Sequence, residues 1–313
     1  MTDNTILISI VSPVYNGAHL LDALVARLTA VLDVMNIRYE IVLVDDGSSD
    51  DSWQKIRQLA SYIPQLKGLK LCQNFGHHNA ITAGIARSVG VYTSVIDCDL
   101  QEDPVLLQEM LPLLQQQGYE LVLTRKDRSG HKTWRNVFSK TFFMLFRLVS
   151  GIAYDNRLAN FCMFDTNVRA QFLQKTQQQK QYLIISLQKM DVHKKVLDAS
   201  ISAHYQAKKS TYSWRKLEHT AYEIAVLYAS PVFKFLLGLL MPILFYFTLY
   251  ASVMLYMLLV KGLSYNLLFN LFWLLVWIFN VAMLSFVVKF LLEMRKQKKR
   301  PKLYEICQNT ETI

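Results

Sequence analysis

The sequence is poor in cysteine, proline and glycine, which contribute four, seven and 11 of its 313 residues. The low glycine and proline contents exclude a collagen-like protein or a low-complexity linker. The four cysteines, Cys72, Cys98, Cys162 and Cys307, form no Cys-x-x-Cys pair and no cluster at zinc spacing. This scatter argues against a disulfide scaffold or a structural zinc site, and it favours a reducing, cytosolic environment.

Signals of other protein classes are also missing. We predict no secretory signal, because Asp3 stands where a positive charge is needed and the apolar run Ile6–Val11 is too short. Intrinsic disorder is excluded by a hydrophobic content of 52%. The net charge of +10 needs no nucleic-acid partner, since the basic segment Arg295–Arg300 is expected to attract anionic membrane lipid.

Charge is absent from two long stretches near the C-terminus, Phe235–Val260 and Gly262–Val288. Each exceeds the roughly 20 apolar residues that cross a bilayer core. The basic segment that follows them predicts, by the positive-inside rule, a hairpin of two membrane helices with both ends in the cytoplasm. We expect an integral protein of the bacterial inner membrane, and the oligomeric state is left open.

Before these spans, short β-branched runs alternate with amphipathic stretches. This alternation predicts an α/β fold with a mostly parallel, doubly wound sheet. The expected strands are Ile6–Val11, Glu40–Val44, Leu69–Cys72, Tyr92–Ile96 and Tyr119–Thr124, and the expected helices are His19–Met35, Trp53–Tyr62 and Ala80–Val89.

An acidic triplet, Asp97-Cys-Asp99-Leu-Gln101, follows one of the expected strands. Residues i and i+2 of a strand project to the same side, so the two carboxylates and the amide form a set of hard oxygen ligands suited to Mg²⁺ or Mn²⁺. The structural alternative is an acidic turn before a helix. Asp103 fits that alternative as a helix cap before Pro104.

Polar residues follow two further strands. Asp45 and Asp46 could accept hydrogen bonds from a base or a ribose, and Tyr15 could pack against a base. The alternative is an ordinary polar turn, with Asp50 or Asp51 capping the next helix. Ligands at three strand ends on one sheet edge together indicate a nucleotide crevice.

Four segments together carry a family resemblance: Ser12-Pro-Val-Tyr-Asn16, Val44-Asp-Asp-Gly-Ser48, Asn74-Phe-Gly76 and Asp97-Cys-Asp-Leu-Gln-Glu-Asp-Pro104. The chain resembles glycosyltransferase family 2, and more narrowly the polyprenyl-phosphate sugar transferases similar to dolichol-phosphate mannose synthase. Ser210-Thr-Tyr212-Ser-Trp-Arg215-Lys216 is similar to a Ser-x-Tyr-x-x-Arg-Lys segment of that subgroup. The resemblance implies a GT-A fold, a UDP- or GDP-sugar donor, a divalent metal and an isoprenoid-phosphate acceptor.

The resemblance and the local chemistry together give a set of expected site residues. For the nucleotide sugar they are Pro13, Tyr15, Asn16, Asp45, Asp46, Asn74 and Asp97. For the metal they are Asp97, Asp99 and Gln101. For the acceptor phosphate they are Arg125, Lys126, Arg128, Ser210, Tyr212, Arg215 and Lys216, although the basic ones could equally be surface charges near anionic lipid. Asp99, Arg128 and Asn160 are the expected catalytic residues.

The segment Ala159–Met163 departs from the family pattern. Many relatives read Gly-Asp-Phe-Arg-Leu there, so Asn160 replaces a carboxylate and Cys162 replaces a cation. Asn160 cannot act as a base, and we expect it to hydrogen-bond the donor or the acceptor. We interpret His77 and His78 as loop or donor-pocket residues without a neighbouring carboxylate.

The expected layout is a cytoplasmic GT-A domain (1–209), a juxtamembrane linker (210–230), two membrane helices within 231–292 (about 231–260 and 265–292) and a basic cytoplasmic tail (293–313). The expected activity is inverting, metal-dependent transfer of one sugar to a polyprenyl phosphate, for assembly or modification of a cell-surface glycan. Two alternatives stay open: transfer to the hydroxyl of a lipid-linked oligosaccharide, and a non-catalytic partner that binds a nucleotide sugar.

Overall fold

The computed structural model of the protein describes residues 5–126, 147, 150–151, 155, 157–178, 180–199, 222–224, 226–261, 267–298 and 303–312. The chain divides into two compact units. One comprises Met1–Asn136, Tyr154–Ser210 and Pro301–Ile313, and we call it the catalytic unit. The other comprises Val137–Ala153 and Thr211–Arg300, and we call it the helical unit.

The catalytic unit is built on a mixed sheet that is mostly parallel. Among the described residues its strand order is β7-β5-β6-β4-β1-β2-β3-β8. Strands β3, β2, β1 and β4 run parallel, whereas β6 is antiparallel to β4 and to β5. The strands are β1 (Ile8–Val14), β2 (Tyr39–Asp45), β3 (Leu66–Leu71), β4 (Tyr92–Val95), β5 (Leu121–Lys126), β6 (Leu158–Asp165), β7 (Lys194–Ala199) and β8 (Ile306–Asn309).

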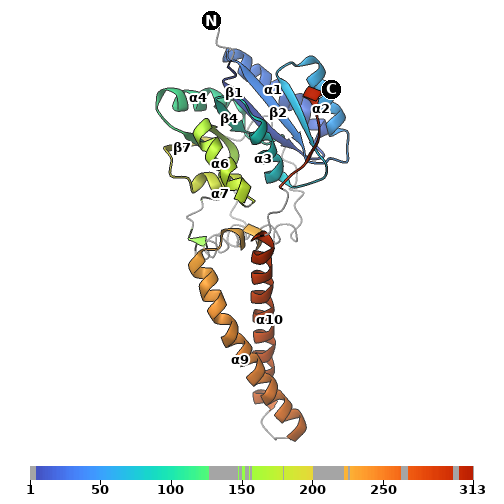
Figure 1. Cartoon of the computed structure of the whole chain (residues 1–313), viewed down its shortest axis with the longest axis vertical. Coiled ribbons are helices and arrows are strands. Elements are labelled where there is room, and N and C mark those ends of the chain that lie inside the picture. Colours follow the sequence, from blue (N-terminus) through green and yellow to red (C-terminus); the bar gives the residue numbers. More distant parts are fainter. Residues whose placement is uncertain are drawn as a thin grey trace. The chain divides into compact units, whose positions relative to one another are not determined.

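Helices cover both faces of this sheet (Figure 1). One face carries α1 (Leu21–Val34), α2 (Ser52–Tyr62) and α4 (Leu107–Gln116), and the other carries α3 (His77–Arg87), α6 (Thr166–Gln178) and α7 (Leu183–Gln188). Because both faces are covered, β1 and β2 are buried along their whole lengths. The predicted doubly wound sheet is therefore confirmed.

The C-terminal segment Pro301–Ile313, part of the expected basic cytoplasmic tail, belongs to the catalytic unit. Strand β8 pairs antiparallel with β3 at the sheet edge, and Figure 1 shows it in dark red beside α2. Trp53 Nε1 donates to Gln308 Oε1 (2.6 Å), and the Gly68 N–H donates to Thr310 Oγ1 (2.8 Å). Lys67 Nζ bridges the buried Glu40 (3.1 Å) and Glu311 (2.8 Å). These contacts give the last residues a fixed place on the sheet.

A disulfide joins Cys72, just after β3, to Cys307 in β8. The scattered cysteines predicted no disulfide scaffold, and for this pair the structure corrects that expectation. The two residues are 235 positions apart in sequence, and only the pairing of β3 with β8 brings them together. No local spacing signal could have indicated this bond.

The helical unit contains two long helices, α9 (Pro231–Lys261) and α10 (Leu267–Lys298). Phe235–Met254 and Leu274–Leu292 are long and apolar enough to cross a membrane, and only 17% and 11% of these windows are buried. Such exposure excludes the core helices of a soluble domain, which bury their apolar side chains. The structure thus contains the two expected C-terminal candidate membrane helices.

Candidate nucleotide-sugar site

The carboxyl ends of β1, β2 and β4 meet at one edge of the sheet, where the sequence predicted a crevice. Pro13 lies in β1 and is buried, whereas Tyr15, just after the strand, is 50% exposed. The Asn16 N–H donates to Ser48 Oγ (2.9 Å), and the Ser49 N–H donates to Asn16 Oδ1 (2.9 Å). Asn16 therefore links the loops that follow β1 and β2.

Asp45 and Asp46 are both buried and bonded to the protein. Asp45 Oδ1 accepts the Ser48 N–H (3.1 Å), which closes the turn after β2. Asp46 accepts the N–H groups of Phe75 (2.8 Å) and Gly76 (3.0 Å). Burial raises the pKa of Asp46, because the two N–H donors offset only part of the desolvation. Direct contact of either carboxylate with a nucleotide stays a prediction.

The loop after β3 connects Asp46 to the first turn of α3. Gly76 has φ of 95°, a backbone conformation that residues with a Cβ rarely adopt, and it precedes His77 at the start of the helix. Asn74 lies in the same loop and is exposed. The bonds from Asp46 to this loop and the turn at Gly76 together set where α3 begins, and hence where His77 lies.

Asp97, just beyond β4, lies against His77 and Asn160. His77 Nε2 is 3.3 Å from Asp97 Oδ1, and Asn160 Nδ2 is 3.2 Å from Asp97 Oδ2 and 3.1 Å from His77 Nε2. Asn160 comes from β6, which pairs with β4. Burial disfavours the charged His77 imidazolium, but the carboxylates of Asp97, Asp46 and Asp99 together outweigh this effect and raise the pKa of His77.

The other two expected metal ligands lie in the turn after Asp97. The Gln101 side chain donates through Nε2 to Asp99 Oδ2 (2.7 Å), and its backbone N–H donates to Asp99 Oδ1 (3.2 Å). Leu100 has φ of 54°, an unusual conformation for a residue with a Cβ. Asp103 caps the following turn by accepting the Val105 N–H (3.1 Å), as its position before Pro104 predicted.

The side chains of this turn offer the kind of ligand atoms that a divalent cation binds. Asp97, Asp99 and Gln101 are partly exposed and offer hard oxygen ligands, which Mg²⁺ and Mn²⁺ prefer. Within the described parts of the chain, no group of three or more His, Cys, Asp and Glu side chains forms a metal cluster. A cation held by two carboxylates would complete its shell with the amide, with donor phosphate oxygens and with water.

The thiols near this site are poor nucleophiles. Burial raises the pKa of Cys98 to about 12, with a further contribution from the carboxylates of Asp97 and Asp99. Burial also raises the pKa of Cys162, which is fully buried in β6. Because only the thiolate is strongly nucleophilic, neither cysteine is suited to covalent catalysis.

Of the expected acceptor-phosphate residues, Arg125 is described in full and Lys126 by its backbone alone. Arg125 Nε donates to Asp198 Oδ1 (2.7 Å) across the β5–β7 pair, so its guanidinium is engaged by an exposed carboxylate. Lys126 ends β5. The others, namely Arg128, Ser210, Tyr212, Arg215 and Lys216, lie outside the described residues.

His77 is the residue that the sequence interpretation misjudged. We expected no carboxylate near the two histidines, yet Asp97 contacts His77. The contact joins the start of α3 to the end of β4, which are 20 residues apart, so local sequence could not reveal it. His78 is different, because its ring packs on Tyr182 with the ring centroids 4.5 Å apart.

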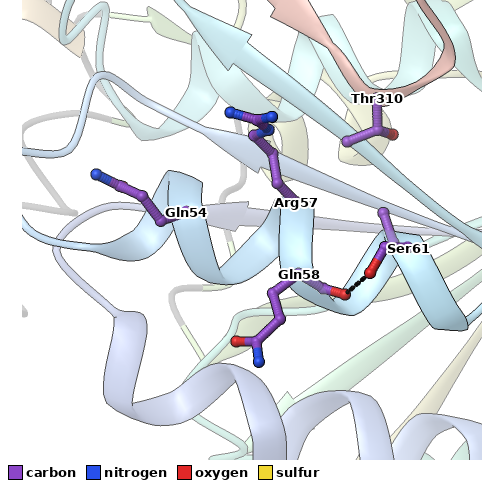
Figure 2. Close-up of a pocket in the computed structure, with 6 residues that line it drawn as sticks. Gln54, Arg57, Gln58, Ser61 and Thr310 are labelled. Atoms are coloured by element: carbon purple, nitrogen blue, oxygen red, sulfur yellow. Dashed lines mark hydrogen bonds between the residues drawn. The ribbon is translucent and has the colours of Figure 1, made fainter. Parts of the chain in front are cut away.

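A cavity elsewhere in the catalytic unit does not coincide with the acidic cluster. It has a volume of about 490 Å³ and lies between α2 and the C-terminal segment, as Figure 2 shows. Its lining contains a single cation and no carboxylate. The lining residues are Gln54, Arg57, Gln58, Ala60, Ser61 and Thr310.

Comparison with known proteins gives a family match. Residues 9–181 match glycosyl transferase family 2. The chain is 37% identical over 135 residues to an undecaprenyl-phosphate 4-deoxy-4-formamido-L-arabinose transferase of Aeromonas hydrophila. This match covers 43% of this chain and 41% of that protein. It is 36% identical over 166 residues to the uncharacterized glycosyltransferase sll0501 of Synechocystis sp., and this match covers 52% of each of the two proteins. The chain thus spans about half the length of the curated relatives it matches.

Among solved structures, a mannosyltransferase from Pyrobaculum calidifontis in complex with GDP-Man and Mn²⁺ superposes with a TM-score of 0.47. The identity is 15%, and the match covers 71% of this chain and 64% of that one. A likeness of this strength bears on neither ligand nor metal in the present chain. The family match, together with the strand order of the sheet, confirms the expected GT-A fold.

Proposed function

Because the chain belongs to glycosyl transferase family 2, we propose that it transfers one sugar, with inversion, from a UDP- or GDP-sugar to a polyprenyl phosphate at the cytoplasmic face of a membrane. The observation that carries the proposal is the cluster around Asp97 and Asp99, which lies at the ends of parallel strands in a chain with two candidate membrane helices. Named relatives that act on undecaprenyl phosphate support the choice of acceptor.

In this proposal the acidic cluster holds the diphosphate end of the donor. Asp97, Asp99 and the amide of Gln101 would hold Mg²⁺ or Mn²⁺, which when bound stabilises the negative charge on the departing nucleoside diphosphate. Tyr15 is exposed at the neighbouring strand end and is free to stack on the base. Asp45 and Asp46 shape the adjoining loops through their bonds to backbone N–H groups.

The acceptor chemistry agrees with the absence of a carboxylate at position 160. A phosphate monoester has a second pKa near 6, so a polyprenyl phosphate is largely ionised at pH 7 and is already nucleophilic. Such an acceptor has little need of a general base, which the Asn160 amide cannot provide. A sugar hydroxyl would need one, and this difference favours the phosphate over a lipid-linked oligosaccharide.

Contacts within the catalytic unit support the hairpin topology. Residues on both sides of the two candidate spans belong to that unit, because β8 follows α10 and pairs with β3. If both helices cross the membrane, the chain therefore has to return to the side from which it entered. The basic residues at the end of α10 favour the cytoplasm as that side. Protease protection in sealed vesicles tests this: the segment after Arg295 and the segment around Asp97 are expected to be cleaved on the same side.

The activity is tested with purified full-length protein in detergent, Mn²⁺ or Mg²⁺ and a panel of radiolabelled UDP- and GDP-sugars, with either polyprenyl phosphate or a lipid-linked oligosaccharide as acceptor. We expect the label in a lipid-extractable, mild-acid-labile product, and we expect EDTA to abolish its formation. Label that appears only on a lipid-linked oligosaccharide would replace the acceptor in the proposal. Nucleotide-sugar binding without any transfer would indicate a non-catalytic partner.

A further inference from the structure

We propose that His77 and Asn160 are positioning residues for Asp97, which together fix the orientation of its carboxylate and thereby strengthen metal-dependent nucleotide binding. The inference rests on the proposed function, since it takes Asp97 to be a metal ligand. It assigns roles to a histidine in the first turn of α3 and to an asparagine in β6.

The geometry makes the Asn160 amide the link between the other two side chains. Its Nδ2 lies 3.2 Å from Asp97 Oδ2 and 3.1 Å from His77 Nε2. An amide NH₂ group has two hydrogens, so it can donate to the carboxylate and, when His77 Nε2 carries no proton, to the ring nitrogen at once. His77 Nε2 also lies 3.3 Å from Asp97 Oδ1, so each oxygen of the Asp97 carboxylate has one of these two residues beside it.

An aspartate at position 160 could not make this arrangement. A carboxylate has no hydrogen to donate, and at this distance it would repel the ionised Asp97. The asparagine therefore removes a like charge from beside the expected metal ligand and adds a donor to it. The Nε2 atom of His77 in turn lies beside both the Asn160 amide and the Asp97 carboxylate.

Two of the three side chains lie in regular elements, and Asp97 lies in the loop just after a strand. Ile96 separates Asp97 from the end of β4. Asn160 lies in β6, which pairs with β4, and His77 is the first residue of α3. Helix α3 packs closely on the sheet at Gly84, where a Cβ would lie 2.4 Å from Val11 Cγ1. Groups fixed by strands and packed helices are positioned more accurately than groups on loops.

Removing a residue that hydrogen-bonds a metal ligand lowers metal affinity or activity by about 10–100-fold. We therefore expect His77→Ala and Asn160→Ala each to raise the Kd for Mn²⁺ by at least about tenfold. In His77→Gln the side-chain oxygen can accept from Asn160 and the side-chain nitrogen can donate to Asp97, so we expect this variant to recover most of the affinity. If the two residues act as one unit, the double alanine variant should lose little more than either single variant.

The experiment measures Mn²⁺ binding by electron paramagnetic resonance of the free ion, with full-length protein in detergent, with and without UDP or GDP. The matched control is His193→Ala, since His193 is exposed, stacks on Tyr119 and contacts the Gly118 carbonyl. A purely structural role would lower the thermal unfolding midpoint of His77→Ala and leave the Mn²⁺ Kd of the folded fraction unchanged.

Three results would overturn the proposal: a wild-type Kd for Mn²⁺ in His77→Ala, equal losses in His77→Gln and His77→Ala, or fully additive losses in the double variant. The readout also separates this inference from the proposed function. Normal Mn²⁺ and nucleotide binding without transfer to polyprenyl phosphate would contradict the proposed activity alone. A wild-type protein that binds no Mn²⁺ would contradict both.

Discussion

Replacing Gly84 with alanine tests how closely α3 must approach the sheet. A Cβ at this position would lie 2.4 Å from Val11 Cγ1 and 3.0 Å from Val44 Cγ2. Both valines are buried in central strands, and β-branched side chains are restricted at χ1, so neither can turn aside easily. The helix has to move outward to admit the methyl group, and His77 at its start would move away from Asp97.

The expected change in stability is the difference between two opposing terms. Alanine improves the helix propensity by about 1 kcal/mol relative to glycine. Overpacking a filled core costs about 1–3 kcal/mol, and a contact as short as 2.4 Å belongs at the upper end of that range. We therefore expect Gly84→Ala to lower the free energy of unfolding of the catalytic unit by about 1–2 kcal/mol.

For a domain of this size that loss corresponds to a thermal midpoint about 2–8 °C lower. The assay is thermal unfolding of the detergent-purified protein, with Gly238→Ala in α9 as the matched control. Apart from the backbone of its own helix, no atom of the described residues lies within 4 Å of a Cβ at Gly238, so that variant should unfold at or above the wild-type temperature. A Gly84→Ala protein with an unchanged or higher midpoint would refute the packing argument.

Three further predictions follow from other contacts. Cys307→Ser should lower the free energy of unfolding by about 2–4 kcal/mol under oxidising conditions, and the difference from wild type should disappear in dithiothreitol. Desolvation lowers the pKa of His78 to about 3, so unfolded protein binds more protons than folded protein below pH 6.5. Stability should therefore fall by at most about 1.4 kcal/mol per pH unit between pH 6.5 and about 3, and His78→Phe should reduce this slope in denaturant titrations. Arg125→Gln should raise the KM for polyprenyl phosphate, whereas Asp198→Asn should lower it by releasing the guanidinium.

Each of these has a clear contrary outcome. A Cys307→Ser protein that differs from wild type equally with and without reductant would show that the serine, and not the lost covalent bond, is responsible. An unchanged acid slope in His78→Phe would assign the pH dependence to other groups. Equal KM values in the Arg125 and Asp198 variants would remove Arg125 from the acceptor site.

The sequence was informative wherever a structural element is determined by its own residues. The run after Leu7 is buried on both faces of the sheet, so its continuous apolar pattern predicts β1. The charge-free stretches likewise predict α9 and α10, because each helix contains a long, strongly apolar segment. Asp103 before Pro104 predicted a local cap, and the cap is present.

Features that depend on distant partners were not predictable. Strand β8 is four residues long with partly exposed side chains, and its partner β3 lies far away in sequence. The contacts of Asp97 with His77 and Asn160 arise from the packing of α3 and the pairing of β6 with β4. The sequence around Arg125 is typical of a basic loop, and only the pairing of β5 with β7 shows that Asp198 lies beside Arg125.

The most direct test of the account compares sugar transfer to polyprenyl phosphate by wild-type protein, Asp99→Asn and the exposed control Asp191→Asn. The Asp99 change keeps the shape of the side chain and removes the charge that would hold the cation. Since such a cation contributes several kcal/mol to stabilising the developing charge, we expect transfer to fall by about 100-fold or more. The Asp191 variant should match wild type. Transfer by Asp99→Asn at the wild-type rate would contradict the assignment of the acidic turn as the metal and donor site.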